Sequence, residues 1–281
     1  VWSVARTSTL AYRLPIRSND SCLMIRFIGD ADFDHTRPES TAVVITNLGT
    51  PDAPTASAVR RYLAQFLSDS RVIEAPRWLW WLVLHGVILR TRPRRSARAY
   101  ASVWGVDGSP LLSIGKRQAR ALEDTLAANG TPVPVRIAMR YGNPSLAEVL
   151  EEFRGQGLRQ LLVLPLYPQY SASTTGSTFD ALSAELSRWR RIPSLQFIDA
   201  YHVDPGYIQA LAKSVRDAWA AEPKGERLLM SFHGLPEEYL HRGDPYFCQC
   251  HATARGVANA LELEDEEWAI AFQSRVGPKQ W

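Results

Sequence analysis

A single histidine stands where a buried strand of this chain is expected to end, and imidazole suits proton transfer and metal binding near neutral pH. Leu228 to Phe232 form a short apolar run of the kind that fills a parallel sheet, and His233 and Gly234 end it in a turn. Ligands of open α/β sheets bind beyond the carboxyl ends of the strands. We therefore expect His233 to face a pocket, although a histidine in such a place can also be purely structural.

The strand that carries His233 is half of an internal repeat. Two segments share one plan, an apolar strand that ends in Gly-x-Pro, and Leu48 and His233 occupy equivalent places in it. Two further segments are strands broken by a Gly and Pro turn. The four repeat segments are Thr41–Pro51, Glu226–Pro236, Ile137–Pro144 and Ile270–Pro278. The repeat predicts an α/β fold of two similar Rossmann-like halves, each a parallel sheet flanked by helices, with the active-site cleft between them.

Amphipathic segments supply the flanking helices. Apolar side chains recur at helical spacing on one face of each, and cap residues mark several of the starts. The helices are expected at Thr55–Leu67, Ser145–Arg154, Phe179–Trp189, Asp204–Trp219 and Gln249–Leu261. We assign residues 41–166 to the first half and 167–281 to the second. The second half stops after its second strand, so by the repeat it lacks its last helix and strand, and the chain is expected to be truncated.

Composition limits the classes of function. The chain of 281 residues has 46% hydrophobic residues and no apolar run long enough to span a bilayer. Its 32 basic and 29 acidic residues give a net charge of +3, too weak and scattered to predict nucleic-acid binding. Three cysteines cannot form a disulfide framework, which favours a reducing, cytoplasmic setting. Residues 1–40 show no helix or strand period and are expected to be a disordered or non-native extension. Residues 1–23 precede Met24, the first methionine, so this part is the candidate for upstream translated sequence.

Four motifs occur in a specific order along the chain. They are Asn47–Asp52, Leu161–Thr178, Leu228–Cys250 and Phe272–Trp281. In this order they resemble the motifs of bacterial ferrochelatases, from about Thr41 to the last residue. The resemblance implies a lyase that inserts ferrous iron into protoporphyrin IX to form protohaem, the last step of haem biosynthesis. It also implies that Fe2+ is a substrate and that no nucleotide cofactor is required.

Metal insertion requires loss of two pyrrole protons and delivery of iron to one face of the ring. A neutral imidazole could accept a proton or hold ferrous iron weakly, and both roles remain open for His233. The candidate porphyrin-binding residues are Leu48, Arg140, Tyr141, Tyr167, Tyr170, Ser171 and Arg90. The resemblance places Leu48 on the face opposite His233, and Arg140 and Tyr141 at the pocket wall. Packing at strand ends explains the tyrosines equally well. The hydroxyl-rich segment Ser171–Thr178 could start an anion-binding helix, but it lacks a phosphate-loop or dinucleotide motif.

An aromatic apolar stretch, Trp78–Leu89, is too short to cross a membrane. It is either a core helix or, as the resemblance implies, a lip of the porphyrin pocket that could touch a bilayer surface. Five arginines follow it, at Arg90, Arg92, Arg94, Arg95 and Arg98. Guanidinium groups bind propionates or lipid phosphates, and they are equally suited to a solvated surface.

Two functions remain as alternatives to a working ferrochelatase. The resemblance implies a glutamate opposite His233 in a segment that no residue here matches, so the chain could be a catalytically dead tetrapyrrole-binding fragment. It could also be a related chelatase for another metal or tetrapyrrole. Cys248 and Cys250 do not complete an iron-sulfur ligand set, and we assign no cluster to them. The oligomeric state is left unassigned.

Overall fold

Residues 27–29 and 33–274 are described by the computed structural model, so most of the expected extension at 1–40 and the end of the motif Phe272–Trp281 lie outside the described residues. Four parallel strands form the larger sheet, in the order β2-β1-β3-β4. The strands are β1 (Ser40–Thr50), β2 (Val135–Gly142), β3 (Leu158–Pro165) and β4 (Ser194–Phe197). This is the parallel α/β architecture that the repeat predicts.

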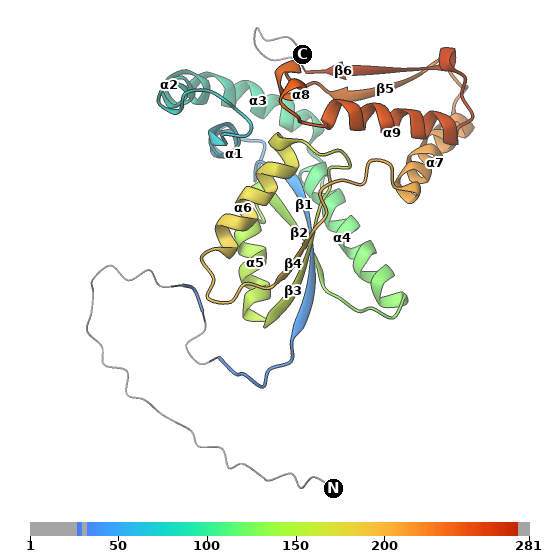
Figure 1. Cartoon of the computed structure of the whole chain (residues 1–281). Coiled ribbons are helices and arrows are strands. Elements are labelled where there is room, and N and C mark those ends of the chain that lie inside the picture. Colours follow the sequence, from blue (N-terminus) through green and yellow to red (C-terminus); the bar gives the residue numbers. More distant parts are fainter. Residues whose placement is uncertain (1–26, 30–32, 275–281) are drawn as a thin grey trace, which may run out of the picture.

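Helices cover both faces of this sheet (Figure 1). One face packs against α5 (Leu146–Gly155) and α6 (Ser177–Leu186), and the other packs against α4 (Pro110–Ala128). Because both faces are buried, β1 is apolar on successive residues, and Val44 contacts the α5 side while Ile45 contacts the α4 side. This double cover explains why the strand reads as a continuous apolar run.

A second unit contains the strand that carries His233. Its sheet has two parallel strands, and α9 packs against β6 and α7. The elements are α7 (Pro205–Ala221), β5 (Leu228–His233), α8 (Glu237–His241), α9 (Tyr246–Ala260), the 3-10 turn η3 (Asp265–Glu267) and β6 (Trp268–Gln273). In Figure 1 this unit lies beyond one end of the larger sheet, on the side where α1 to α3 also lie.

Strand pairing confirms the internal repeat. Aligning the two Gly-x-Pro segments equates Ile45 with Met230, and aligning the other two equates Ile137 with Ile270. In the larger sheet Ile45 pairs with Ile137, and in the smaller sheet Met230 pairs with Ile270. The two sheets therefore share both strand direction and register, as expected for related halves.

The larger sheet continues past residue 166, where the sequence places the boundary between the halves. The strand β4 pairs with β3 through contacts such as Leu161 with Leu195, and α6 packs on the first sheet with the buried side chain of Leu182. The first α/β unit therefore extends to about Phe197. The repeat could not show this, because β4 has only four residues and three of them are exposed, so it carries little apolar signal.

Side-chain caps begin three helices, and the sequence predicts those at Ser145 and Asp204. Thr55 accepts a hydrogen bond from the backbone of Ala58, Ser145 forms a capping box with Glu148, and Asp204 accepts from the backbone N–H of Tyr207. These residues satisfy free N–H groups in the first turns of α1 (Ala56–Ser68), α5 and α7. Local sequence alone thus fixes the starts of three helices.

Gly49 allows the first sheet to close at its carboxyl end. Its φ is +115°, and a Cβ atom there would lie 1.7 Å from the carbonyl oxygen of Tyr141 on the neighbouring strand. Only glycine tolerates both the conformation and the approach. The Gly of the Gly-x-Pro motif therefore has a structural role at the point where β1 and β2 end.

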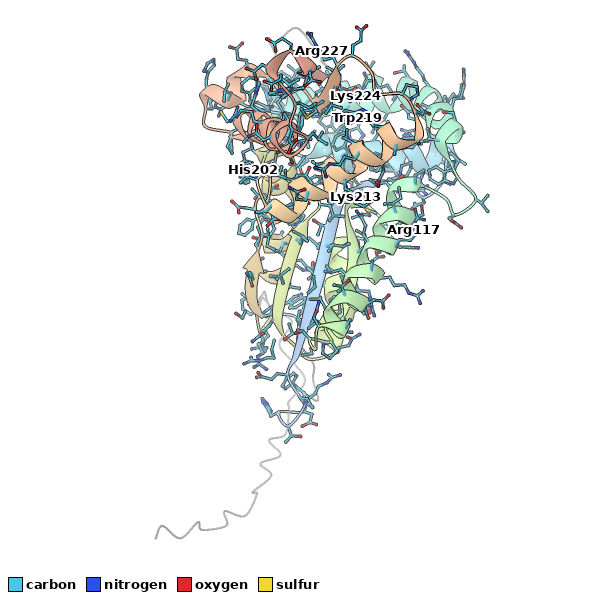
Figure 2. The ribbon with its side chains drawn as sticks, turned by 90° about the vertical axis from the view of Figure 1, so that its right-hand side faces the viewer. Arg117, His202, Lys213, Trp219, Lys224 and Arg227 are labelled. Atoms are coloured by element: carbon cyan, nitrogen blue, oxygen red, sulfur yellow. The ribbon has the colours of Figure 1, made fainter. Side chains whose placement is uncertain are left out.

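The surface formed by α7 and the following loop is shown in Figure 2. The charged ends there are largely paired: Lys213 lies 2.5 Å from Asp217, and Lys224 lies 2.9 Å from Glu267. Lys224 also lies 5.0 Å from the centre of the Trp219 ring, a cation-π contact. Lys213 therefore belongs to an ion pair on α7, and Lys224, in the loop after α7, pairs with η3.

An apolar helical segment projects from the first unit. It consists of α2 (Arg77–Val83), the π-helical turn η1 (Leu84–Ile88) and α3 (Leu89–Val103), with a second π-helical turn, η2 (Ala172–Gly176), preceding α6. Leu84 and Leu89 are buried against α1, whereas Trp78 is 70% exposed and Trp81 is 59% exposed. The segment is thus only partly a core helix. Within residues 27–29 and 33–274, no helix combines the length and apolarity needed to cross a membrane.

Candidate active site

His233 is the last residue of β5, at the carboxyl end predicted for it. Its side chain is exposed, and it alternates along the strand with Leu229 and Ser231 on the open face of the small sheet. The imidazole Nδ1 lies 2.7 Å from the carbonyl oxygen of Gly234. A carbonyl only accepts, so Nδ1 carries the proton and the neutral ring has its lone pair on Nε2. The geometry selects the tautomer that can take a proton or bind a metal through Nε2.

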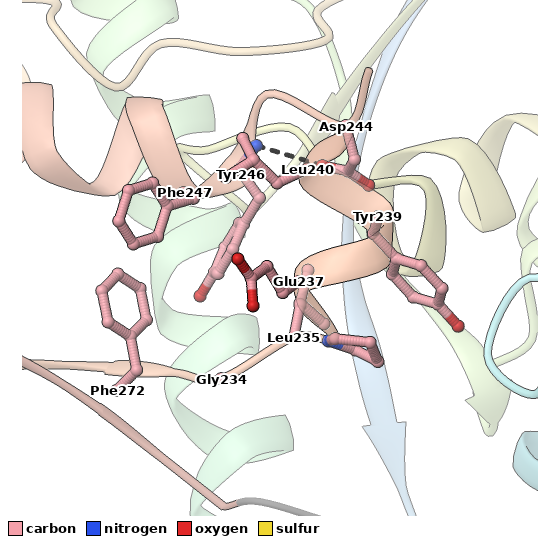
Figure 3. Close-up of a pocket in the computed structure, with 10 residues that line it drawn as sticks. Gly234, Leu235, Glu237, Tyr239, Leu240, Asp244, Tyr246, Phe247 and Phe272 are labelled. Atoms are coloured by element: carbon pink, nitrogen blue, oxygen red, sulfur yellow. Dashed lines mark hydrogen bonds between the residues drawn. The ribbon is translucent and has the colours of Figure 1, made fainter. Parts of the chain in front are cut away.

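A pocket of about 330 Å³ opens directly after His233. It is bounded by α8, the start of α9 and β6, and its lining is Gly234, Leu235, Pro236, Glu237, Tyr239, Leu240, Asp244, Tyr246, Phe247 and Phe272. Figure 3 shows Phe247 and Phe272 facing each other, with ring centres 5.3 Å apart. The lining does not include His233. The pocket therefore reaches Gly234, the residue after His233, but the imidazole is not part of its wall.

The first unit contributes to this region through the loop after β3. The carboxylate of Asp244 accepts hydrogen bonds from the backbone N–H of Ala172 at 2.8 Å and from the Ser171 hydroxyl at 3.1 Å. The backbone N–H of Tyr170 donates to the Gln249 side chain at 2.6 Å. These contacts join segments that are more than 70 residues apart in the sequence. The structure therefore brings the predicted Tyr170 and Ser171 close to the His233 unit.

A smaller cavity of about 220 Å³ lies between the two units. Tyr170 and Ala172 line it from the first unit, and Tyr239 and Asp244 line it from the second. Glu74 and Arg242 also belong to its wall and pair across the units at 2.8 Å. A space with walls from both units is the arrangement predicted for a cleft between the halves.

Comparison with known proteins decides the family. The ferrochelatase family model matches residues 40–281. The chain belongs to the ferrochelatase family. A ferrochelatase of Thioalkalivibrio sulfidiphilus is 55% identical over 258 residues, which is 92% of this chain and 70% of that protein. A ferrochelatase of Nitrosococcus oceani is 54% identical over 257 residues, with the same two coverages, and ferrochelatase 2 of Shewanella oneidensis is 55% identical over 88% of this chain and 76% of its own length.

In this ferrochelatase-family chain, Arg140 and Tyr141 form a polar cluster inside the first unit. The Arg140 guanidinium donates to Asp69 at 2.6 Å and to the Ser177 hydroxyl at 2.8 Å. The Tyr141 hydroxyl donates to the same Asp69 oxygen at 2.8 Å, and the Arg140 guanidinium lies 4.5 Å from the Tyr141 ring centre. Neither residue lines the two cavities described above. Their hydrogen bonds give both a structural role, and porphyrin contact by either stays a prediction.

Asp69 holds this cluster together. Burial raises the pKa of its carboxyl group, but hydrogen bonds from Ser177 and Tyr141, the Arg71 backbone N–H and the charge of Arg140 outweigh burial and leave the pKa below its usual value. Burial raises the pKa of the Tyr141 hydroxyl, so it remains a donor at neutral pH. The Asp69 carboxylate therefore accepts hydrogen bonds from three side chains, which are one guanidinium group and two hydroxyl groups.

The other predicted substrate residues occupy different environments. Leu48 is half-buried near the end of β1. The Tyr167 hydroxyl is buried with no hydrogen-bond partner among the described residues, and burial raises its pKa. Arg90 is exposed on α3. Of this set, Tyr170 and Ser171 form hydrogen bonds with the His233 unit, and binding by the whole set stays a prediction.

The two cysteines near the site differ in environment. Cys248 is exposed and Cys250 is fully buried, and burial raises the pKa of the Cys250 thiol to about 12. Over residues 27–29 and 33–274, no three His, Cys, Asp or Glu side chains are grouped so that they could hold a metal ion. The two thiols thus differ in exposure, and the absence of a cluster and of a cofactor requirement stays a prediction.

Sequence reasoning missed Asp69, Ser177, Asp244 and Tyr246. Asp244 is partly buried and accepts hydrogen bonds from the other unit. Asp244 and Tyr246 could have been found from the sequence, because they belong to the same motif as His233, Leu228–Cys250. For Asp69 there was no such signal, because its partners lie 71 to 108 residues away.

Proposed function

We propose that this chain inserts ferrous iron into protoporphyrin IX and forms protohaem. The observation that carries the proposal is the position of His233, at the carboxyl end of a parallel strand with its Nε2 lone pair selected by the Gly234 carbonyl. Membership of the ferrochelatase family supports the choice of metal and porphyrin. All three relatives named above are ferrochelatases, which disfavours a chelatase for another metal.

The reaction is balanced by proton loss. Ferrous iron enters as a dication, the two pyrrole N–H groups each release a proton, and the product is neutral at its metallated core. The Nε2 atom of His233 either accepts a pyrrole proton or holds Fe2+ before transfer, and both roles use the same lone pair. The Nδ1 contact with Gly234 keeps that tautomer in place.

The porphyrin would lie between the two units, where their loops meet. In this proposal Leu48, Tyr170 and Ser171 bound it from the first unit, and the arginines from Arg90 onward pair with its propionates. Aromatic and aliphatic walls, as in the pocket of Phe247 and Phe272, suit a flat apolar macrocycle. Arg140, Tyr141 and Tyr167 would act mainly by shaping the loop ends of the first sheet.

Metal insertion by the purified chain tests the function. Loss of protoporphyrin fluorescence on adding ferrous iron under anaerobic conditions, with appearance of the haem absorption spectrum, is the expected result. Parallel reactions with zinc and cobalt measure metal preference. Porphyrin binding without any metallated product would instead support a catalytically dead binding fragment, and preference for cobalt would support a different chelatase.

We also propose that the apolar helical segment contacts a membrane surface, where the hydrophobic porphyrin dissolves. Trp78, Trp81, Leu82 and Val87 are each more than half exposed, and a row of arginines on α3 follows them. Aromatic side chains insert at the lipid interface, and guanidinium groups pair with lipid phosphates. The cytoplasmic location expected from the sequence stays a prediction.

Vesicle binding checks this contact. The chain should float with vesicles that contain anionic lipid, and replacing Trp78 and Trp81 together by serine should lower the bound fraction at least about fivefold, since each exposed ring loses its apolar burial in lipid. Replacing the exposed Ile192, which lies in the first unit before β4, by serine is the matched control and should leave binding unchanged. Equal binding of the two variants would contradict the proposal.

A further inference from the structure

The loop 167–171 lies between the end of β3 and the start of η2. It carries Tyr170 and Ser171, two of the candidate porphyrin-binding residues. Gln169 is 8% exposed and Ser171 is 1% exposed, so their polar groups are withdrawn from water and need partners inside the protein. The partners come from the second unit and from the segment that leads to it.

Two residues of α9 hold the middle of this loop. The side-chain amide of Gln169 donates to the Thr253 hydroxyl at 2.9 Å, and the backbone N–H of Tyr170 donates to the Gln249 side chain at 2.6 Å. Gln249 and Thr253 are four residues apart and therefore lie one turn from each other on the same face of the helix. One face of α9 thus binds two successive residues of the loop.

The contact at Thr253 is enclosed in the protein. Thr253 is 2% exposed, and its O–H group donates to the carbonyl oxygen of His202 at 2.9 Å while its oxygen accepts from Gln169. The hydroxyl therefore joins three segments, which are the loop, α9 and the stretch before α7. An apolar side chain of the same shape could neither donate nor accept here.

The two ends of the loop are held in the same way. At one end the carbonyl oxygen of Pro168 accepts from the backbone N–H of Tyr201, in the segment that leads into α7, at 2.9 Å. At the other end Asp244 accepts from Ser171 and from Ala172, the first residue of η2. Each residue from 168 to 172 therefore has a hydrogen bond to the second unit or to the segment that leads to it.

The helix that holds the loop is itself firmly packed. Cys250, Ala254 and Val257 on α9 are at most 3% exposed. A Cβ atom at Gly256 would lie 3.0 Å from the Ile208 side chain of α7, so the two helices are in close contact. A packed helix holds its partners more precisely than a loop does, so α9 is a suitable support for the loop 167–171.

We propose that Gln249 and Thr253 are positioning residues for the porphyrin. Gln249 fixes the backbone at Tyr170, and Thr253 fixes the neighbouring Gln169. The inference rests on the proposed function, because it assumes that the porphyrin binds where Tyr170 lines the cavity between the two units. A loop released from α9 has to be ordered when porphyrin binds, and this cost weakens binding without changing the chemistry at the metal.

Gln249→Met removes the acceptor for the Tyr170 N–H and keeps the length of the side chain. We expect the KM and the dissociation constant for protoporphyrin IX to rise about fivefold, the factor for loss of one hydrogen bond, while kcat stays within about twofold. Gln249→Glu keeps an acceptor oxygen and should return both constants to within about twofold of wild type. Gln209→Met, which replaces an exposed glutamine on α7, is the matched control and should leave all three values unchanged.

A double-mutant cycle tests the hydrogen bond between Gln169 and Thr253. Thr253→Val and Gln169→Met remove the two sides of one contact, so each should weaken porphyrin binding about fivefold and the double variant no more than about tenfold. Independent effects would multiply to about 25-fold, which would show that the two side chains do not act together. Thermal unfolding of each variant is measured alongside, and where Thr253→Val does not fold, the Gln249 variants still decide the positioning role.

Hydrogen exchange of the Tyr170 amide gives a readout that does not need turnover. The amide should exchange at least about tenfold faster in Gln249→Met than in the wild-type chain, and at the wild-type rate in Gln249→Glu and Gln209→Met. An unchanged exchange rate, or an unchanged affinity for protoporphyrin IX despite faster exchange, would overturn the inference even if the chain is a working chelatase. Faster exchange with weaker porphyrin binding in a chain that makes no haem would support the inference and refute only the proposed function.

Discussion

Replacing His233 by alanine should lower the rate of iron insertion at least about 100-fold, the range expected when a general base or metal ligand is removed. The side chain is exposed at the end of β5, so its loss leaves no core cavity. Porphyrin binding, measured by fluorescence quenching, and the midpoint of thermal unfolding should both stay close to the wild-type values. The measurement is the steady-state rate of haem formation by both chains.

His241→Ala is the matched control for that result. His241 lies on the neighbouring helix α8, its side chain is 70% exposed, and its Nε2 is 3.4 Å from Glu237. Its replacement should change the rate by less than about twofold. A His233→Ala chain that keeps half of the wild-type rate would show that proton removal and iron delivery use other groups.

Replacing Asp69 by asparagine should lower the free energy of unfolding by about 3 kcal/mol, the lower end of the range for breaking a buried ion pair. The Asp69 side chain is only 8% exposed, and Arg140, Tyr141 and Ser177 would lose their shared acceptor. Urea unfolding followed by circular dichroism measures the change. Asp217→Asn, whose ion pair with Lys213 is exposed, should cost less than about 0.5 kcal/mol.

The effect of Asp69 should depend on pH. The folded-state pKa of Asp69 lies below its unfolded value, so its contribution is fully present above the unfolded pKa of about 4 and is lost as pH falls through the folded pKa. The stability difference between wild type and Asp69→Asn should therefore be constant from pH 5 to 8 and shrink below about pH 4. A difference that grows on acidification would contradict the assigned role of the carboxylate.

Local patterns were sufficient for much of the fold. The caps at Thr55, Ser145 and Asp204 are made by side chains within three residues of their partners, so sequence spacing reveals them directly. The internal repeat could also be found in the sequence, because parallel strands of related halves keep the same order of apolar residues and turns. The sequence did not show that β4 belongs to the first sheet, because β4 is short and exposed and depends on pairing with β3.

For the candidate site, the sequence by itself determined the position of His233 at a strand end and the segments that surround it. These follow from the apolar run, the Gly-x-Pro turn and the order of the motifs. Only the tertiary structure decided that Arg140 and Tyr141 share Asp69, and that Asp244 of the second unit accepts hydrogen bonds from Ser171 and Ala172 of the first. Hydrogen bonds between polar side chains far apart in the chain leave no periodic pattern, so their partners appear only when the two units are packed together.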